Sequence, residues 1–221
     1  HLDIFLERYS KKETTGQTRG TLSALRHIAF ILGPLIAGLV LGENAFGDMY
    51  LTAAFFILPA LALLVYSFQS FPDPDYTYTS IWQSLKTAWR DVNVRWTLLC
   101  MFILKLFFAW MVVYTPIYLH QYIGLPFDQI GVIFSIMLLP YVLMGRELGE
   151  IADQWLGEKE LLIAGFIITA GFTASLTFID TQEVIVWGLL LFGTRVGTTM
   201  VQVMSAGYFF KHVEAAAINE L

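Results

Sequence analysis

Six apolar segments run through this chain, and the lysines and arginines between them fall only in every second connection. The segments cover residues 21–41, 49–70, 97–120, 129–145, 161–179 and 184–210. A helix rises about 1.5 Å per residue, so about 20 apolar residues cross the roughly 30 Å of hydrocarbon in a bilayer. The fourth segment is the shortest. We therefore predict an all-α membrane protein, a polytopic helical bundle with six transmembrane helices.

Composition excludes a soluble globular domain. Hydrophobic residues make up 57% of the chain and charged residues only 14%, and the mean hydropathy is +0.63. This leaves too little polar surface to cover a soluble fold of 221 residues. The single cysteine, Cys100, lies in an apolar run, which excludes a disulfide framework and a thiolate metal site. We expect no metal, no cofactor and no nucleic-acid partner.

The distribution of basic residues predicts the orientation of the helices. Basic residues precede the first segment, lie between the second and third and between the fourth and fifth, and follow the sixth, whereas the other three connections carry only acidic charges. Because loops rich in lysine and arginine stay in the cytoplasm, both ends and the long central connection are predicted to be cytoplasmic. We expect a multi-pass protein of a bacterial inner membrane.

The long connection divides the chain into two parts. It opens with Pro72-Asp73-Pro74-Asp75, which stops a helix and starts a turn. We predict that residues 1–70 end an N-terminal bundle, that residues 71–96 form a cytoplasmic linker, and that residues 97–221 are part of a C-terminal bundle. Apolar residues at helical spacing between 81 and 92 predict an amphipathic helix, either on the inner leaflet or packed on the ends of the spans. The chain begins in a polar stretch without an initiator Met, so we interpret it as an internal piece.

Spaced glycines in the connection between the fourth and fifth segments resemble a family signature. The motif residues are Gly149, Asp153, Gly157 and Lys159. They resemble the cytoplasmic loop signature of the major facilitator superfamily between its eighth and ninth helices, although Gln154 and Glu158 stand where basic residues are usual.

Two further stretches carry the same resemblance. Gly33, Pro34 and Gly38 are similar to the glycine–proline motif in the fifth helix of that superfamily, which is most associated with proton-coupled exporters. Residues 118–131 resemble its connection between helices seven and eight. The resemblance covers nearly the whole chain and implies that the spans are helices five to ten of twelve.

The resemblance also implies a mechanism. It implies two six-helix bundles that rock about a site at the membrane midplane. Asp153 would then pair with a helix end or a basic group in one state and release it in the other, with Arg146 and Lys159 as local candidates. Alternatively, Gly149, Asp153 and Gly157 only shape a tight cytoplasmic turn.

Two cations lie inside the predicted spans without an acidic residue at comparable depth. Lys105 lies roughly 13 Å into the third span, and Arg195 near the middle of the sixth. A basic residue at the membrane centre costs about 2.5 to 3.5 kcal/mol and usually has a partner. We hypothesise that both bind an anionic group on a substrate, or hold a coupling carboxylate on a helix outside this chain. Lys105 could instead snorkel to the interface, and Arg195, between Gly193 and Gly197, could form a structural interhelical pair.

Other polar residues have two interpretations. Tyr114 and Gln202 could contact a ligand or bind neighbouring helices. Arg26 and His27 are predicted in the first two turns of the first span, where interfacial anchoring is the expected role, with a proton-relay role for His27 as the alternative.

These observations favour a secondary active transporter of a small molecule, coupled to protons rather than sodium. No P-loop is present, so ATP-driven transport by this chain is not expected. The glycine–proline motif favours export, whereas the two cations favour an anion. A non-transporting sensor or scaffold on the same fold is the alternative. An intramembrane enzyme is less favoured, because serine and histidine do not occur together at mid-depth.

Overall fold

The computed structural model describes the backbone of residues 15–41, 46–67, 82, 89, 92–154 and 156–219, and within it the side chains of residues 25–41, 46–66, 82, 89, 92–144, 147–149, 151–152 and 156–208. The predicted linker, with its amphipathic helix, lies almost entirely outside these residues. Its last five residues, 92–96, are already helical.

All-α structure is confirmed for the described residues. The helices are α2 (Thr15–Leu41), α3 (Phe46–Ser67), α5 (Val92–Gln121), α6 (Phe127–Leu143), α7 (Gly145–Gln154), α8 (Glu158–Ser175), the short 3-10 helix η1 (Leu176–Phe178) and α9 (Val184–Asn219). Each of the six predicted spans corresponds to one of these helices.

Length separates the six helices into two groups. Among the described residues, four apolar helical segments are long enough to cross a membrane, namely Phe46–Tyr66, Val92–Gln121, Glu158–Phe178 and Val184–Tyr208. The apolar parts of α2 and α6, Leu25–Leu41 and Phe127–Leu143, are shorter and lie at the lower limit for a span.

The connection between the fourth and fifth spans is a helix, which the sequence analysis did not predict. Gly149 and the backbone of Asp153 belong to α7, so these two positions are helical rather than part of a loop or tight turn, whereas Gly157 lies in the short connection before α8. The physical reason is the amphipathic pattern of α7: Leu148 and Ala152, one helical turn apart, both pack against a cluster that includes Met200 and Met204 of α9.

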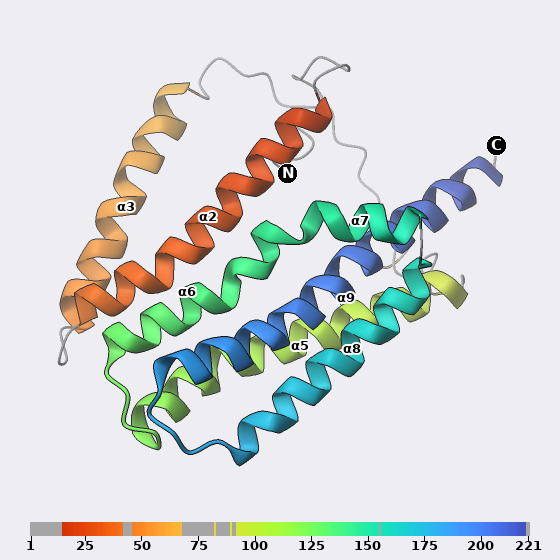
Figure 1. The fold of residues 1–221 in the computed structure, drawn as a ribbon. Helices are drawn as coiled ribbons and strands as arrows, with labels where there is room; N and C mark the ends of the chain where they lie inside the picture. Colours follow the sequence, from red (N-terminus) through yellow and green to blue (C-terminus); the bar gives the residue numbers. More distant parts are fainter. Residues whose placement is uncertain are drawn as a thin grey trace.

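Helix α9 is the centre of the arrangement. It packs against α5, α6, α7 and α8, while α2 packs against α6. Figure 1 shows α6 between α2 and α9, with α3 beside α2 at the edge of the molecule. The large apolar side chains of α3 are exposed among the described residues, as expected for a surface that faces lipid.

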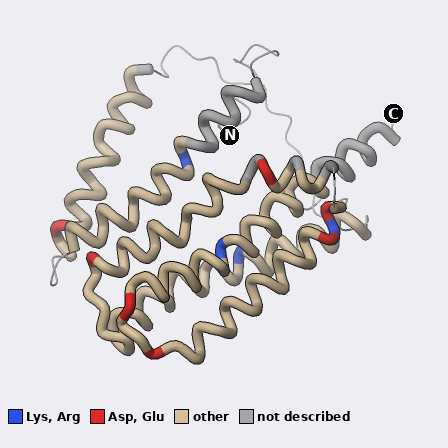
Figure 2. The backbone as a smooth tube through the Cα atoms, in the orientation of Figure 1, with Lys and Arg blue, Asp and Glu red and all other residues tan. Residues whose placement is uncertain are grey.

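Two apolar clusters lie on either side of Arg195 along α9. One includes Trp187 and Leu191 of α9 and side chains of α5 and α6. The other includes Met200 and Met204 of α9 and side chains of α7 and α8. Lys105 and Arg195 lie well inside their helices α5 and α9, whereas Figure 2 shows that acidic positions gather near helix ends.

The loops at the end of the bundle opposite α7 are joined. Gly124, in the turn after α5, has a φ of 81°, which glycine adopts without steric cost. In the loop before α9, the Gln182 side-chain amide donates a hydrogen bond of 2.9 Å to the carbonyl of Ile123. The α5–α6 and α8–α9 connections are thus in direct contact.

Candidate functional site

A cavity of about 660 Å³ lies between α2 on one side and α5, α6 and α9 on the other. Six polar or charged residues line it: Arg26, His27, Lys105, Tyr141, Arg195 and Gln202. Its apolar lining includes Phe30, Phe108 and Phe134. None of the described lining residues is acidic, so basic charge dominates the cavity.

Arg195 is held in this cavity by the way α9 packs on α8. An added Cβ on Gly197 would lie 2.5 Å from the carbonyl oxygen of Gly165 and would also meet Thr169, and one on Gly193 would meet the ring of Phe172. Gly197 lets the two backbones approach closely, as the glycine spacing predicted, and Gly193 makes room for the Phe172 ring. Arg195 is two residues from each of them, roughly 200° around the helix, and therefore faces away from α8.

The guanidinium of Arg195 is buried but incompletely bonded. Only 4% of the residue is exposed. Tyr141 of α6 lies close enough to interact with it electrostatically, whereas its buried Nε has no hydrogen-bond partner among the described residues. An unbonded polar atom of a buried cation is costly, which favours an anionic ligand at this position.

Phe108 brings the two predicted cations to one aromatic ring. The Arg195 Cζ lies 4.8 Å from the centre of the Phe108 ring, and the Lys105 Nζ lies 5.4 Å from it. Both distances are within the range of cation–π interactions. Because α5 begins at Val92, Lys105 lies roughly 20 Å along its helix.

His27 is in the middle of helix α2, which begins at Thr15, and in the first turn of its apolar part, Leu25–Leu41, in agreement with the predicted position in the first two turns of the span. The imidazole stacks on the Tyr141 ring, with 5.7 Å between ring centroids and 16° between planes. The Tyr141 ring also lies 6.4 Å from the ring of Phe108, on which Arg195 packs, so aromatic contacts connect His27 on α2 with Arg195 on α9.

The structure brings together three of the four predicted binding residues. Lys105, Arg195 and Gln202 all line the cavity. Tyr114 is not among the lining residues; it is exposed, and its ring lies 5.4 Å from that of Trp110. Its role in binding stays a prediction.

The motif residues near α7 lie apart from this cavity. Gly157 is the N-cap of α8, where a Cβ would meet the side chain of Glu160. The Lys159 Nζ lies 5.6 Å from the ring of Tyr208 on α9. The side chains of Asp153 and Arg146 lie outside the described residues.

The glycine–proline motif of α2 contacts α6. An added Cβ on Gly38 would lie 2.7 Å from the carbonyl oxygen of Phe127, and one on Gly131 would lie 2.6 Å from that of Pro34. Gly33 has no atom within 4 Å of an added Cβ and lines the cavity instead. The three motif residues therefore divide between a helix contact and the cavity.

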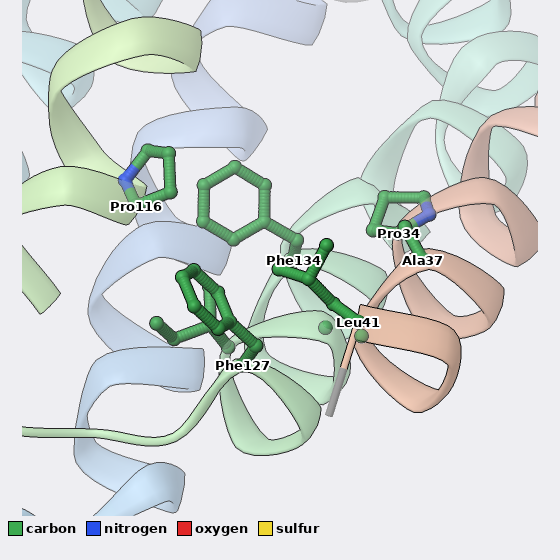
Figure 3. Close-up of a pocket in the computed structure, with 9 residues that line it drawn as sticks. Pro34, Ala37, Leu41, Pro116, Phe127 and Phe134 are labelled. Atoms are coloured by element: carbon green, nitrogen blue, oxygen red, sulfur yellow. The ribbon is translucent and has the colours of Figure 1, made fainter. Parts of the chain in front are cut away.

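A small apolar pocket of about 150 Å³ adjoins the contact between α2 and α6. Figure 3 shows the rings of Phe127 and Phe134 between Pro116 of α5 and the side chains of α2. Beside it, the Ser135 hydroxyl shares its hydrogen between the carbonyls of Ile31 and Gly131, each at 2.9 Å. Pro34 lacks an N–H for the carbonyl of Phe30, and the donor from α6 bonds to the next carbonyl of α2, that of Ile31.

Sequence reasoning missed the aromatic partners of the cations. Phe108 carries no polar atom, and its position three residues after Lys105 was the only available signal. Among the residues that the structure describes, no three His, Cys, Asp or Glu side chains gather where a metal ion could bind.

Comparison with known proteins identifies the family. The family model described as Major Facilitator Superfamily matches residues 3–218. The chain belongs to the Major Facilitator Superfamily. Searches of curated proteins and of solved structures gave no match. The chain is therefore an integral, multi-pass membrane protein of a family of membrane transporters with small-molecule substrates rather than of enzymes.

Proposed function

We propose that this chain is part of a secondary active transporter that moves a small anionic molecule by alternating access. Residues 1–70 contribute to one bundle, residues 71–96 link the bundles, and residues 97–221 contribute to the other. In this arrangement α2 belongs to the first bundle and α5, α6 and α9 to the second. The cavity of about 660 Å³ then lies at the boundary that rocking motion opens and closes.

The observation that carries this proposal is the buried Arg195, whose Nε lacks a partner beside a cavity without described acidic residues. Lys105 and Gln202 line the same cavity. A substrate oxyanion would accept hydrogen bonds from the guanidinium and neutralise the local charge. A carboxylate on another helix of the protein would do the same, and transport measurements separate these two ligands.

We propose coupling to protons rather than sodium. The cavity contains a histidine, the side chain that titrates near neutral pH, and the described lining residues include no carboxylate to bind sodium. Both ends of the chain and the linker are assigned to the cytoplasm of a bacterium, from the distribution of basic residues.

Proton flux in liposomes tests the transport function. The full-length protein would be reconstituted with a trapped pH dye and given a panel of organic anions, sugars and lipophilic cations. We expect an organic anion to drive a proton flux that Arg195→Gln abolishes. Arg95→Gln, a change at the end of α5 outside the cavity lining, is the matched control and should keep the flux. Equal flux in both variants would contradict a substrate site in the cavity. If folded protein gave no proton flux with any compound of the panel, the transport function would be contradicted.

We also propose that the α7 motif controls the change between states. Gly149 and Asp153 lie on a helix that packs on α9, next to the start of α8 with Gly157 and Lys159. Asp153→Lys should then abolish transport while the protein still inserts. Glu147→Lys, an exposed acidic position on the same helix, is the control. Normal transport by Asp153→Lys would reduce the motif to a structural role.

A further inference from the structure

Phe108 lies where three helices meet at the wall of the cavity. It belongs to α5, and its ring lies 6.4 Å from the ring of Tyr141 on α6, with an angle of 64° between the two planes. From α9, the Cζ of Arg195 lies 4.8 Å from the centre of the Phe108 ring. Contacts from two neighbouring helices restrict the movement of the ring. A side chain without a polar atom is thereby held beside a buried charge.

The same ring also contacts the second cation of the cavity. Lys105 precedes Phe108 by three residues on α5, and its Nζ lies 5.4 Å from the ring centre. Lys105 is exposed among the described residues, whereas Arg195 is buried. A lysine has a flexible stem of four carbons, so its ammonium is able to move away toward water. Attraction to the negative face of the ring opposes this movement.

Phe108 therefore keeps two like charges close to each other. Since both lie about 5 Å from one ring centre, the ammonium of Lys105 and the guanidinium of Arg195 are at most about 10 Å apart. Like charges at this distance repel each other, and none of the described lining residues supplies an acidic charge. A ligand with two anionic groups can neutralise both cations, whereas a ligand with one neutralises only one of them.

We infer that Phe108 is a positioning residue that holds Lys105 beside Arg195, and that the cavity consequently prefers anions with two negative charges. The inference rests on the proposed function, and it adds the charge of the substrate and the side chain that determines this preference. When the ring is absent, Lys105 leaves its position, while α9 still holds Arg195 in the cavity. Singly and doubly charged anions then bind almost equally well.

Affinities for matched pairs of probe anions test this inference. Succinate and glutarate would each be compared with their monomethyl esters, which keep the carbon chain and lose one charge. Binding to the full-length protein in lipid nanodiscs would be measured by titration calorimetry. We expect each dianion to bind at least about tenfold more tightly than its ester. In Phe108→Leu and in Lys105→Gln, the ratio of the two affinities should fall to within about twofold.

Further variants separate positioning by the ring from a purely structural role. Trifluorophenylalanine at position 108 keeps the shape of the ring but weakens its negative face, so the affinity ratio should fall as in Phe108→Leu. Phe108→Tyr keeps this face and should keep the ratio. Phe107→Leu is the matched control, because Phe107 packs on an apolar cluster and is not among the lining residues.

The results that overturn the inference differ from those that overturn the proposed function. If the parent bound dianions and esters equally and Arg195→Gln abolished both, the anion site would stand and the charge preference would be wrong. If the ratio survived trifluorophenylalanine at position 108, the ring would act by packing rather than by attraction. Binding of none of the four compounds would also overturn the inference, and the flux of another anion, lost in Arg195→Gln, would then show that the proposed function survives.

Discussion

The contact of α8 with α9 and the contact of α2 with α6 are both built on paired glycines, yet their surroundings differ. Gly165 and Gly197 lie among Thr169, Val201 and Met200. The contact of Gly38 with Gly131 lies beside a small pocket and shares Pro34 with the large cavity. Under the proposed mechanism, tight glycine packing serves a permanent contact inside one bundle at α8 and α9 and a changeable contact between two bundles at α2 and α6. The contact of α2 with α6 is then the one that alternating access would rearrange.

The largest effect is expected at the contact of α8 with α9. Gly197→Leu places a side chain against the backbone of Gly165, which cannot move without displacing a whole helix. We expect the free energy of unfolding to fall by about 3 kcal/mol or more, so that little folded protein is obtained. Detergent-solubilised yield and a thermal melt measure this. Gly171→Leu on α8, where nothing lies within 4 Å of an added Cβ, is the control.

At the contact of α2 with α6, we expect a smaller loss of stability and a larger loss of transport. Gly131→Ala would put a Cβ 2.6 Å from the Pro34 carbonyl oxygen and 3.1 Å from the Cα of Gly38. The two helices must separate slightly, which the neighbouring pocket permits. Flux should fall roughly tenfold, equivalent to about 1.4 kcal/mol of barrier, while the melt stays near that of the parent. A flux that falls only in proportion to folded protein would make the two contacts equivalent.

Substitutions at the two glycines of the α2 motif should have different effects in the same flux and melting assays. Gly38→Ala meets the carbonyl oxygen of Phe127 at 2.7 Å, whereas Gly33→Ala meets nothing within 4 Å. We expect Gly38→Ala to behave like Gly131→Ala and Gly33→Ala to keep flux within about twofold. If Gly33→Ala were the more harmful change, the motif would act through the cavity rather than through the contact with α6.

The smallest effect is expected from the hydroxyl of Ser135. Ser135→Ala removes its hydrogen bond to the Ile31 carbonyl, and such bonds contribute about 0.6 kcal/mol in membrane proteins. Ser175→Ala, whose hydroxyl bonds within its own helix, is the matched control. Unfolding by a denaturing detergent should give a lower free energy of unfolding for Ser135→Ala than for Ser175→Ala. If the two values were equal, packing alone would stabilise the contact of α2 with α6.

The spans could be predicted because hydrophobic length is a local property of the sequence. The close approach around Arg195 could be predicted as well, since Gly193 and Gly197 are near it in the chain. The contact between Gly38 and Gly131 could not, because nothing local pairs residues so far apart. Helix α7 was missed because its polar surface resembles a loop when hydropathy alone is considered.

The lining of the cavity shows a second limit. Helix α5 is apolar nearly all round, so its sequence does not reveal which face is turned inward. Tyr114 was selected for its polar group, whereas the side chain between the two cations is Phe108. Which ring lies beside a buried charge depends on helix rotation, and that is set by the packing of the whole bundle.

The hydrogen bond from Gln182 to the carbonyl of Ile123 has a mechanical consequence. It joins the α5–α6 and α8–α9 connections at one end of the bundle, whereas at the other end Leu148 of α7 packs against methionine side chains. We therefore expect the distances between these helices to fluctuate less near Gln182 than near α7.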